Sequence, residues 1–299
     1  MMIKQLYQSL TRTIVLSLLL FSAVAVTGKT LGVKHSLQHQ ADSVVRILAI
    51  GNSFSEDAIE HFLSGLAIAG GHKIIVGNLF IGAADLDLHC KNALDDKPAY
   101  NYRKIDVLGN KKKRAKTSIS YALADEKWDY ISLQQVSNKS GLAKTYEEPL
   151  PQVLRYLKSY VSNPHTQYIL HQTWAYKQSA TIPVFAVYDF SQIKMYKSIT
   201  KTSKKIYYKY HFDLLIPSGT AIQNARNWFS DDEINRDDIH LSYLVGRYIA
   251  SCTWYQKIFK EPALGNGFYP QGLTLKETEL AQKAADSACK KPFRISSVK

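Results

Sequence analysis

The sequence of 299 residues carries 38 Lys or Arg and 25 Asp or Glu, which gives a formal net charge of +13 at pH 7. This surplus favours acidic partners such as a uronate-rich glycan or an anionic envelope surface, although a solvated basic surface explains it equally well. The three cysteines, Cys90, Cys252 and Cys289, show no metal-type spacing, so we expect unpaired thiols rather than a disulfide framework or a zinc site.

The N-terminal region predicts export. Lys4 and Arg12 precede a short apolar run that ends in small residues, which is typical of a signal peptide over 1–26. The run is short for a membrane span, and no later stretch approaches about 20 apolar residues, so an uncleaved anchor is the weaker alternative. We expect a polar lead-in over 27–43 and a single periplasmic or extracellular domain over 44–299, with no stable membrane span after cleavage.

Short β-type runs alternate with helix-type segments along this domain. The predicted strands are 45–50, 73–80, 128–133, 167–171 and 212–216, and the predicted helices are about 58–69, 117–126, 148–161, 189–209, 220–227, a long one from near 240, and 274–289. The alternation predicts an α/β fold with a five-stranded parallel sheet and helices on both faces. The insert 83–116 is the least regular, and its basic run at 111–114 is expected in a loop.

Ser53 follows the first predicted strand and precedes a helix. In an open parallel sheet, ligands bind beyond the carboxyl ends of the strands, so this hydroxyl is placed for chemistry. Backbone N–H groups nearby can face a developing oxyanion, but the serine needs a base to become nucleophilic. The simpler alternative is that Ser53 or Ser55 only caps the next helix.

A base is available near the other end of the chain. Asp237 and His240 lie three residues apart at a predicted loop-to-helix junction. A carboxylate there can hold the Nδ1–H of the imidazole and leave Nε2 to accept the serine proton. Asp238 is the alternative acid, but because it lies only two residues before His240, its carboxylate is less well placed to reach the imidazole. The pattern alone also fits a surface turn with a capping aspartate.

These motifs together resemble those of the SGNH (GDSL-like) hydrolases. Gly51-Asn52-Ser53-Phe54-Ser55 resembles their first block, and Asp237-x-x-His240 resembles their last. The resemblance is closer still to one exported family within that superfamily, catalogued as a domain of unknown function, and it extends over about 45–260. Its other segments are 78–89, 128–140, 170–176, 216–226 and 236–242.

The resemblance implies a flavodoxin-like, three-layer α/β/α serine esterase. Ser53 would be the nucleophile, His240 its base and Asp237 the group that orients the base. The oxyanion hole would consist of the N–H of Ser53, the N–H of Gly82 and a side-chain amide from the third block, although Gly82 by itself also fits an ordinary turn.

The third block departs from the superfamily pattern because it lacks the usual G-x-N. The third predicted strand ends in Leu133-Gln-Gln-Val-Ser-Asn138. A glutamine amide donates the same N–H from a longer arm, so Gln134 or Gln135 is the expected third donor, with Asn138 as the alternative. Asn52 stands where the name motif has Asp, and we expect it to support the loop beside the substrate.

Four further residues are candidate substrate contacts. Trp174 and Tyr176 follow the fourth predicted strand and would form a stacking wall for a sugar ring, or pack in the core. His171 is either a polar contact or a buried, hydrogen-bonded histidine. Arg226 would bind a substrate carboxylate through a bidentate hydrogen bond, or form an ordinary surface salt bridge.

The sequence contains no HExxH or CxxC motif, no Walker loop and no GxGxxG, so we expect no metal and no cofactor. Export argues against a nucleic-acid partner. The leading hypothesis is a carbohydrate esterase that removes O-acetyl or similar small acyl groups from a glycan. The alternatives are a noncatalytic glycan-binding protein on the same fold, and a lipase or thioesterase of the same superfamily. No sequence feature predicts an oligomeric state.

Overall fold

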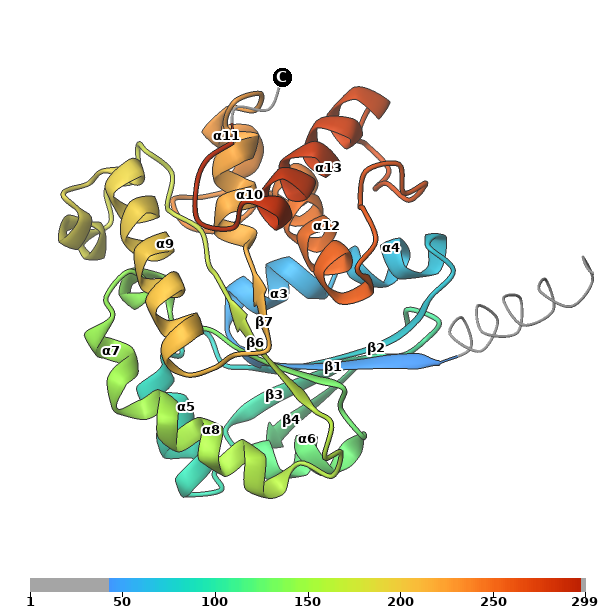
Figure 1. Ribbon diagram of the computed structural model, residues 1–299, viewed down its shortest axis with the longest axis vertical. Helices are drawn as coiled ribbons and strands as arrows, with labels where there is room; N and C mark the ends of the chain where they lie inside the picture. The colour runs from blue at the N-terminus through green and yellow to red at the C-terminus, as the bar shows by residue number, and fades with distance from the viewer. Residues whose placement is uncertain (1–42, 297–299) are drawn as a thin grey trace, which may run out of the picture. The chain divides into compact units, whose positions relative to one another are not determined.

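The computed structural model describes residues 43–296. The predicted signal peptide and the lead-in as far as residue 42 lie outside the described residues. From Val44 onward, the described residues form one compact unit. Within it, the elements alternate between strands and helices as the sequence pattern indicates (Figure 1).

Within residues 43–296, the sheet has seven strands in the order β4-β3-β2-β1-β5-β6-β7. The strands are β1 (Val44–Gly51), β2 (Lys73–Phe80), β3 (Tyr100–Ile105), β4 (Lys111–Thr117), β5 (Tyr130–Leu133), β6 (Gln167–His171) and β7 (Leu214–Ile216). The strands β2-β1-β5-β6-β7 pair in parallel, which is the order of a flavodoxin-like doubly wound sheet. These are the five strands that the sequence predicts.

The prediction of only five strands is wrong, because the insert 83–116 forms a helix and two more strands. β3 pairs antiparallel with β2, and β4 pairs antiparallel with β3 at the edge of the sheet. The basic run at 111–114 is therefore in a strand and not in a loop. Its side chains are exposed on both faces, so it lacks the apolar alternation that marks a half-buried strand.

Helices cover both faces of the sheet (Figure 1). One face carries α3 (Ser53–Ile59), α4 (Leu63–Ala69), α10 (Ser218–Ala225), α12 (Val245–Phe259) and α13 (Leu275–Lys290) over one apolar core; the other carries α5 (Leu86–Leu94), α6 (Ile119–Asp125) and α8 (Pro149–Tyr160) over a second. α9 (Gln192–Lys209) contributes side chains to both cores. Short elements complete the chain: η1 (Ser137–Lys139), α7 (Lys144–Glu147), η2 (Pro183–Tyr188) and α11 (Asp231–Ile234).

The helix predicted over 58–69 is in fact two helices, α3 and α4. The apolar spacing continues across the break, so periodicity alone does not reveal it. Glu60 follows α3 with its carboxylate turned inward, where Arg103 and Lys111 contact it. Within residues 43–296, no helix has the length and apolarity that crossing a bilayer requires.

Candidate active site

Ser53 sits at the carboxyl end of the central strand, where β1 turns sharply into α3. Asn52 caps this helix, since its side-chain oxygen accepts a hydrogen bond from the backbone N–H of Phe54 at 3.0 Å. Gly51 has no room for a side chain, because a Cβ there would lie 2.6 Å from Ser55 Oγ. The turn therefore presents the Ser53 hydroxyl above the sheet, while Ser55 is buried.

The loop before α12 brings a base to this hydroxyl. His240 Nε2 lies 2.9 Å from Ser53 Oγ, and His240 Nδ1 lies 2.8 Å from Asp237 Oδ2. Because a carboxylate only accepts, Nδ1 carries the ring proton and Nε2 faces the serine hydroxyl as an acceptor. Residues separated by 187 positions thus form a continuous Ser-His-Asp hydrogen-bonded array.

Local hydrogen bonds fix the carboxylate of Asp237. Its Oδ1 accepts from the backbone N–H of Ile239 at 2.9 Å and from that of His240 at 2.7 Å. Partial burial alone would raise the pKa of Asp237, but these N–H groups and the imidazole lower it below its usual value. Asp238, the rival acid, instead accepts from the backbone N–H of Thr181 at 3.2 Å.

A buried carboxylate that sequence reasoning missed, Asp57, ties this loop to the helix of the nucleophile. It lies one turn after Ser53 on α3 and is 0% exposed. It accepts from Arg236 Nη1 at 2.9 Å, from Arg247 Nε at 2.7 Å and from the backbone N–H of Leu241 at 3.0 Å. Two of these donors flank the loop of the acid and base, so Asp57 clamps it from both sides.

A directional chain of hydrogen bonds runs along the carboxyl ends of the five parallel strands. Asn52 Nδ2 donates to the Ala84 carbonyl at 2.9 Å, and Gln134 Nε2 donates to Asn52 Oδ1 at 2.8 Å. His171 Nδ1 pairs with Gln134 Oε1 at 2.8 Å, and His171 Nε2 with Ser218 Oγ at 3.0 Å. This strand-end chain of hydrogen bonds holds Asn52 in place, and with it the turn that presents the serine.

His171 therefore has a structural place in the fold. Complete burial lowers its pKa to about 3, so the ring stays neutral. Since Gln134 Oε1 can only accept, Nδ1 carries the proton and Nε2 accepts from Ser218. Of its two alternatives, the buried, hydrogen-bonded histidine is the one found, and the prediction of a substrate contact is wrong.

The serine and histidine open into a cavity of about 630 Å³. Its lining is largely apolar near Val136, Ile182, Val184 and Ile239, and polar near Asn138 and Lys139; the remaining lining residues are Asn52, Ser53, Phe54, Gly82, Ala83, Asp85, Ser137, Tyr176 and His240. Lys139 contacts Asp85 there. This volume is large enough for a small ester and for an acyl group larger than acetyl.

Two backbone N–H groups at the cavity are available to a ligand. Ser53 is the first residue of α3, so its N–H has no partner within the helix. Gly82 lies in the turn after β2, and among the described residues its N–H donates to no carbonyl. Both residues line the cavity.

The two glutamines expected to supply a third donor are placed elsewhere. Gln134 is buried within the strand-end chain. Gln135 donates to Thr145 and accepts from two backbone N–H groups, those of Leu86 and Val136. Neither lines the cavity, so the structure disfavours both as oxyanion donors. Asn138 does line it, and its side-chain amide has no hydrogen-bond partner in the described part of the chain.

Two more of the four predicted substrate contacts, Trp174 and Arg226, are held by interactions within the protein. Trp174 is 0% exposed, stacks on Phe54 at 4.1 Å between centroids and donates its Nε1–H to the Ile239 carbonyl, so it is no sugar-stacking wall. The Arg226 side chain is 9% exposed and pairs with Asp231 at 2.7 Å, so its charge is already matched within the protein.

Tyr176 is the one of these four that lines the cavity, but it is only 1% exposed and its hydroxyl pairs with Ser137 Oγ at 2.8 Å, so it offers no open face for a sugar ring. The three cysteines are free thiols. Among residues 43–296, no group of three or more His, Cys, Asp or Glu side chains is arranged to hold a metal ion.

The fold and site define a doubly wound α/β protein with a Ser-His-Asp array beyond the carboxyl ends of its parallel strands. The chain belongs to the family described as "Domain of unknown function (DUF4886)", whose model matches residues 46–288. It is similar to a crystal structure of a DUF4886 family protein from Bacteroides uniformis, with 41% identity, coverage of 86% of this chain and 98% of that chain, and a TM-score of 0.83.

Two more distant solved structures also match. The acetylxylan esterase Axe2 from Geobacillus stearothermophilus is 14% identical, with 75% of this chain and 94% of that chain covered and a TM-score of 0.45. LAE5, an alpha/beta hydrolase enzyme from the metagenome of Lake Arreo in Spain, is 11% identical, with 72% and 95% covered and a TM-score of 0.45. Both likenesses are too weak to assign an activity. No curated protein matches this chain.

Proposed function

We propose that this protein is a serine ester hydrolase of the SGNH type, with Ser53 as nucleophile, His240 as general base and Asp237 as the group that orients the base. One observation carries the proposal: the unbroken array of Ser53 Oγ, His240 and Asp237 at 2.9 and 2.8 Å. The serine of this array opens into a cavity that fits a small ester.

The proposed reaction begins when Ser53 Oγ attacks the acyl carbonyl and His240 Nε2 takes the hydroxyl proton. The negative charge that develops on the carbonyl oxygen is stabilised by the N–H groups of Ser53 and Gly82 and by the Asn138 amide. His240 then gives its proton to the departing alcohol. A water molecule, activated by the same ring, hydrolyses the acyl-enzyme and restores the serine.

The substrate we propose is a glycan that carries O-acetyl or similar small acyl groups, met in the periplasm or outside the cell. The predicted signal peptide and the net charge of +13 support it. The aromatic residues do not support it, because Trp174 and Tyr176 are both buried. The apolar wall of the cavity favours a second candidate, a lipase or thioesterase that takes longer acyl chains.

The first test compares the mature protein with Ser53→Ala and His240→Ala on p-nitrophenyl acetate and on a panel of acetylated polysaccharides. Both variants should lose nearly all activity, by about 10⁴-fold or more. Ser55→Ala is the matched control on the same helix, because its hydroxyl is buried against Asn78 and Asn52. Circular dichroism establishes that every variant is folded.

The outcomes separate the candidates. A series of nitrophenyl esters with two to sixteen carbons decides between a small-acyl esterase and a long-chain hydrolase, because the latter prefers the longer members. An inert wild-type protein, or an active Ser53→Ala variant, overturns the proposed nucleophile. Retention on a glycan matrix with no acid released from any ester would establish the noncatalytic binding protein instead.

A further inference from the structure

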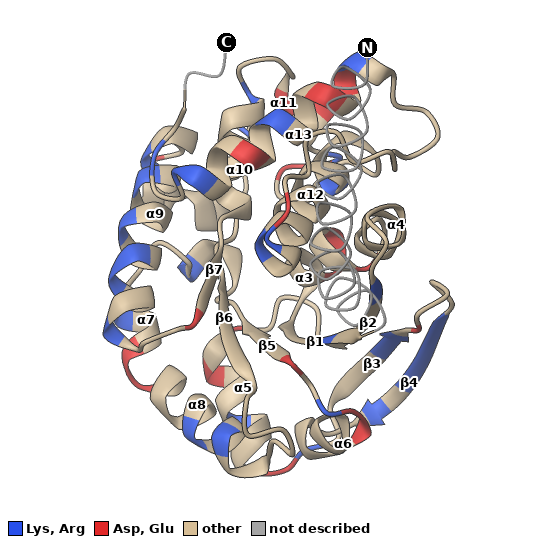
Figure 2. Ribbon diagram, turned by 45° about the vertical axis from the view of Figure 1, so that its right-hand side comes forward, with Lys and Arg blue, Asp and Glu red and all other residues tan. Residues whose placement is uncertain are grey.

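A helix far from the nucleophile in sequence carries an unusual concentration of positive charge. α9 contains six lysines and no acidic residue: Lys194, Lys197, Lys201, Lys204, Lys205 and Lys209. All six are exposed. Figure 2 shows blue Lys segments along α9 with no red among them. Nothing in the proposed ester hydrolysis uses these residues.

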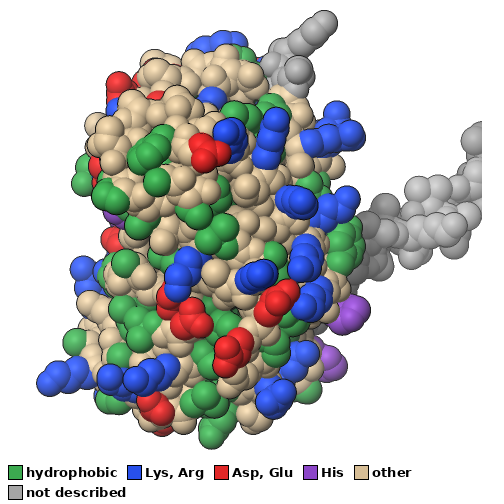
Figure 3. All heavy atoms as spheres, turned by 90° about the vertical axis from the view of Figure 1, so that its left-hand side faces the viewer, with side chains coloured by type: hydrophobic (Ala, Val, Ile, Leu, Met, Phe, Trp, Pro, Cys, Tyr) green, Lys and Arg blue, Asp and Glu red, His purple; other side chains and the backbone are tan. Residues whose placement is uncertain are grey.

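The central lysines share one side of the helix. At 100° per residue, Ile193, Lys197, Lys201, Lys204 and Tyr208 fall within an arc of about 80°, and we call them the lysine face. Ile193 is 37% exposed and Tyr208 is 60% exposed. Figure 3 views the side of the molecule on which α9 lies in Figure 1, and Lys and Arg side chains gather there in a column.

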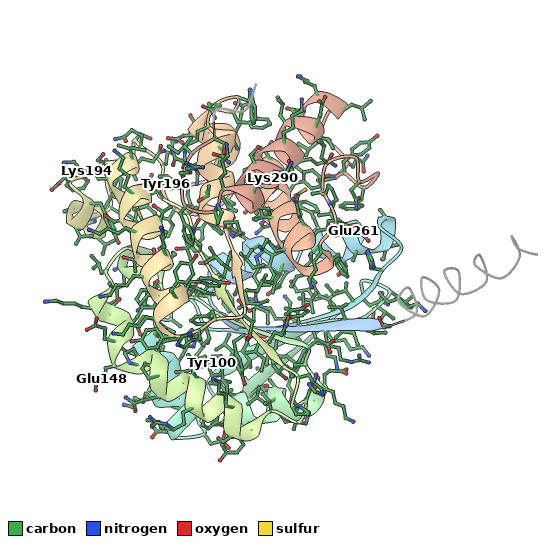
Figure 4. All side chains as sticks on the ribbon, in the orientation of Figure 1. Tyr100, Glu148, Lys194, Tyr196, Glu261 and Lys290 are labelled. Atoms are coloured by element: carbon green, nitrogen blue, oxygen red, sulfur yellow. The ribbon has the colours of Figure 1, made fainter. Side chains whose placement is uncertain are left out.

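The opposite side of α9 is buried, so the helix cannot turn its lysines elsewhere. Tyr196 is 3% exposed and its hydroxyl lies 3.3 Å from Thr220 on α10. Figure 4 shows Lys194 on the outer side of α9 and Tyr196 on the side toward α10. The exposed lysines are therefore held in place by a packed core.

Carboxylates neutralise only the margins of this surface. Lys194 pairs with Asp189 at 2.9 Å, and Lys205 and Lys209 share Glu147 at 3.3 and 3.6 Å. Within residues 43–296, Lys197, Lys201 and Lys204 have no carboxylate within 4.0 Å. Like charges three and four residues apart repel one another along a helix, and a bound polyanion would relieve that repulsion.

The lysine face also connects to the cavity. η2 and the turn after it lead from the cavity wall into α9. Val184 on η2 lines the cavity and is 47% exposed, and Ile193 stands in the first turn of α9. From Ile193 to Lys204 the helix rises about 16 Å, so the lysines form a single file on the helix that follows the cavity-lining segment in the chain.

We propose that the lysine face of α9 binds an anionic polysaccharide, one that carries carboxylate groups along its chain, and guides its acyl esters toward Ser53. A single file of charges about one helical turn apart fits a linear polymer better than a flat bilayer, which needs a broad patch. The inference deepens the proposed function and rests on it for hydrolysis, but the binding itself does not require catalysis.

The test removes charge from the face and leaves the catalytic machinery intact. Lys197→Gln, Lys201→Gln and Lys204→Gln are combined in one variant. The matched control combines Lys112→Gln, Lys113→Gln and Lys276→Gln, which removes the same charge from exposed lysines on β4 and α13. β4 lies at the opposite edge of the sheet from β7.

Binding is measured on a polygalacturonate matrix and on a neutral xylan matrix over a range of salt concentrations. The wild-type protein should bind polygalacturonate in a salt-sensitive manner, and the α9 variant should bind it at least about tenfold more weakly. The control should stay within about twofold of wild type. Hydrolysis of p-nitrophenyl acetate should be equal in all three proteins.

Equal losses in the α9 variant and the control would overturn the proposal, because diffuse charge would then explain binding. Retention only by phosphatidylglycerol vesicles would overturn it in favour of a lipid surface. If polygalacturonate binding depends on α9 but no ester is hydrolysed, the lysine face stands and the proposed esterase function fails. If the wild-type protein hydrolyses esters but does not bind polygalacturonate, the esterase function stands and the proposed role of the lysine face fails.

Discussion

Asp57 shows how one residue, without touching a substrate, sets the geometry of the site. Its carboxylate holds Arg236 and the backbone of Leu241, the two neighbours of the loop that carries Asp237 and His240. Asp57→Asn should lower kcat by about 10- to 100-fold with KM changed less than about threefold, because the base is misplaced while the cavity remains. Stability should fall by about 3 kcal/mol.

Asp231→Asn is the matched control for that prediction. It breaks another ion pair, since Asp231 contacts Arg226, whose side chain is 9% exposed, at 2.7 Å, and Asp231 does not contact the Ser-His-Asp array. Its loss of stability should be similar and its kcat should stay within about threefold of wild type. Parallel losses of kcat in the two variants, measured at a temperature where both are folded, would show that Asp57 acts only on stability.

Asn138 offers a sharper test of the oxyanion hole. Because its amide has no partner within the described residues, Asn138→Ala should change the free energy of unfolding by no more than about 0.5 kcal/mol. If the amide stabilises the oxyanion, kcat should still fall by about 10²- to 10³-fold. An unchanged kcat on p-nitrophenyl acetate would remove Asn138 from the proposed mechanism.

For single residues, the sequence predicts which side chains lie close together better than it predicts which side chains are exposed to solvent. Asp237 and His240 are local neighbours, and the strand-end rule places Ser53 at the same edge, so their assembly follows from short-range pattern and topology. Whether Trp174 and Arg226 face solvent depends on partners such as Phe54 and Asp231, which tertiary packing brings together. No spacing in the sequence signals those contacts.

Among the elements, β4 shows how a sheet edge is protected. Among the described residues it pairs only with β3, so its other side presents unpaired backbone groups, and its exposed lysines discourage another strand from docking there. Lys112→Val with Lys113→Val should leave the fold intact but increase self-association. Light scattering over time at raised protein concentration measures this, with Lys112→Gln and Lys113→Gln as the polar control. Equal scattering from both variants would contradict the role.

The same strand explains what the sequence analysis missed. The five parallel strands are rich in buried apolar residues, and their helical connections leave a clear alternating pattern, so both are predictable. β4 has the sequence Lys-Lys-Lys-Arg-Ala-Lys-Thr and is exposed on both faces over most of its length. Its strand conformation depends on pairing with β3, and a pairing partner leaves no trace in local composition.

For the molecule as a whole, buried histidines make stability depend on pH. Burial lowers the pKa of His171 to about 3 and that of His89 to about 4. In the unfolded chain both rings titrate near pKa 6.5. As pH falls below about 6.5, the two rings take up protons in the unfolded chain but not in the native protein. The stability present at neutral pH is therefore lost progressively as pH falls toward the pKa values of the folded protein.

At pH 5 each of these two rings should cost about 2 kcal/mol, or about 4 kcal/mol together, relative to pH 7.5. Carboxylates with a lowered pKa, such as Asp237, contribute mainly below about pH 4.5. Burial also lowers the pKa of His61 to about 4, so this ring adds a loss of the same sign in the same window. Urea denaturation at pH 7.5, 6 and 5 measures how steeply the free energy of unfolding changes with pH.

His171→Gln should be less stable at neutral pH, yet its slope of stability against pH should be shallower by about one proton. His211→Gln, at an exposed position, should have the slope of wild type. Because the slope counts protons and not contacts, an unchanged slope in His171→Gln would mean that this ring is already protonated in the native protein, and the strand-end chain through Gln134 and Ser218 would then need a different hydrogen-bond direction.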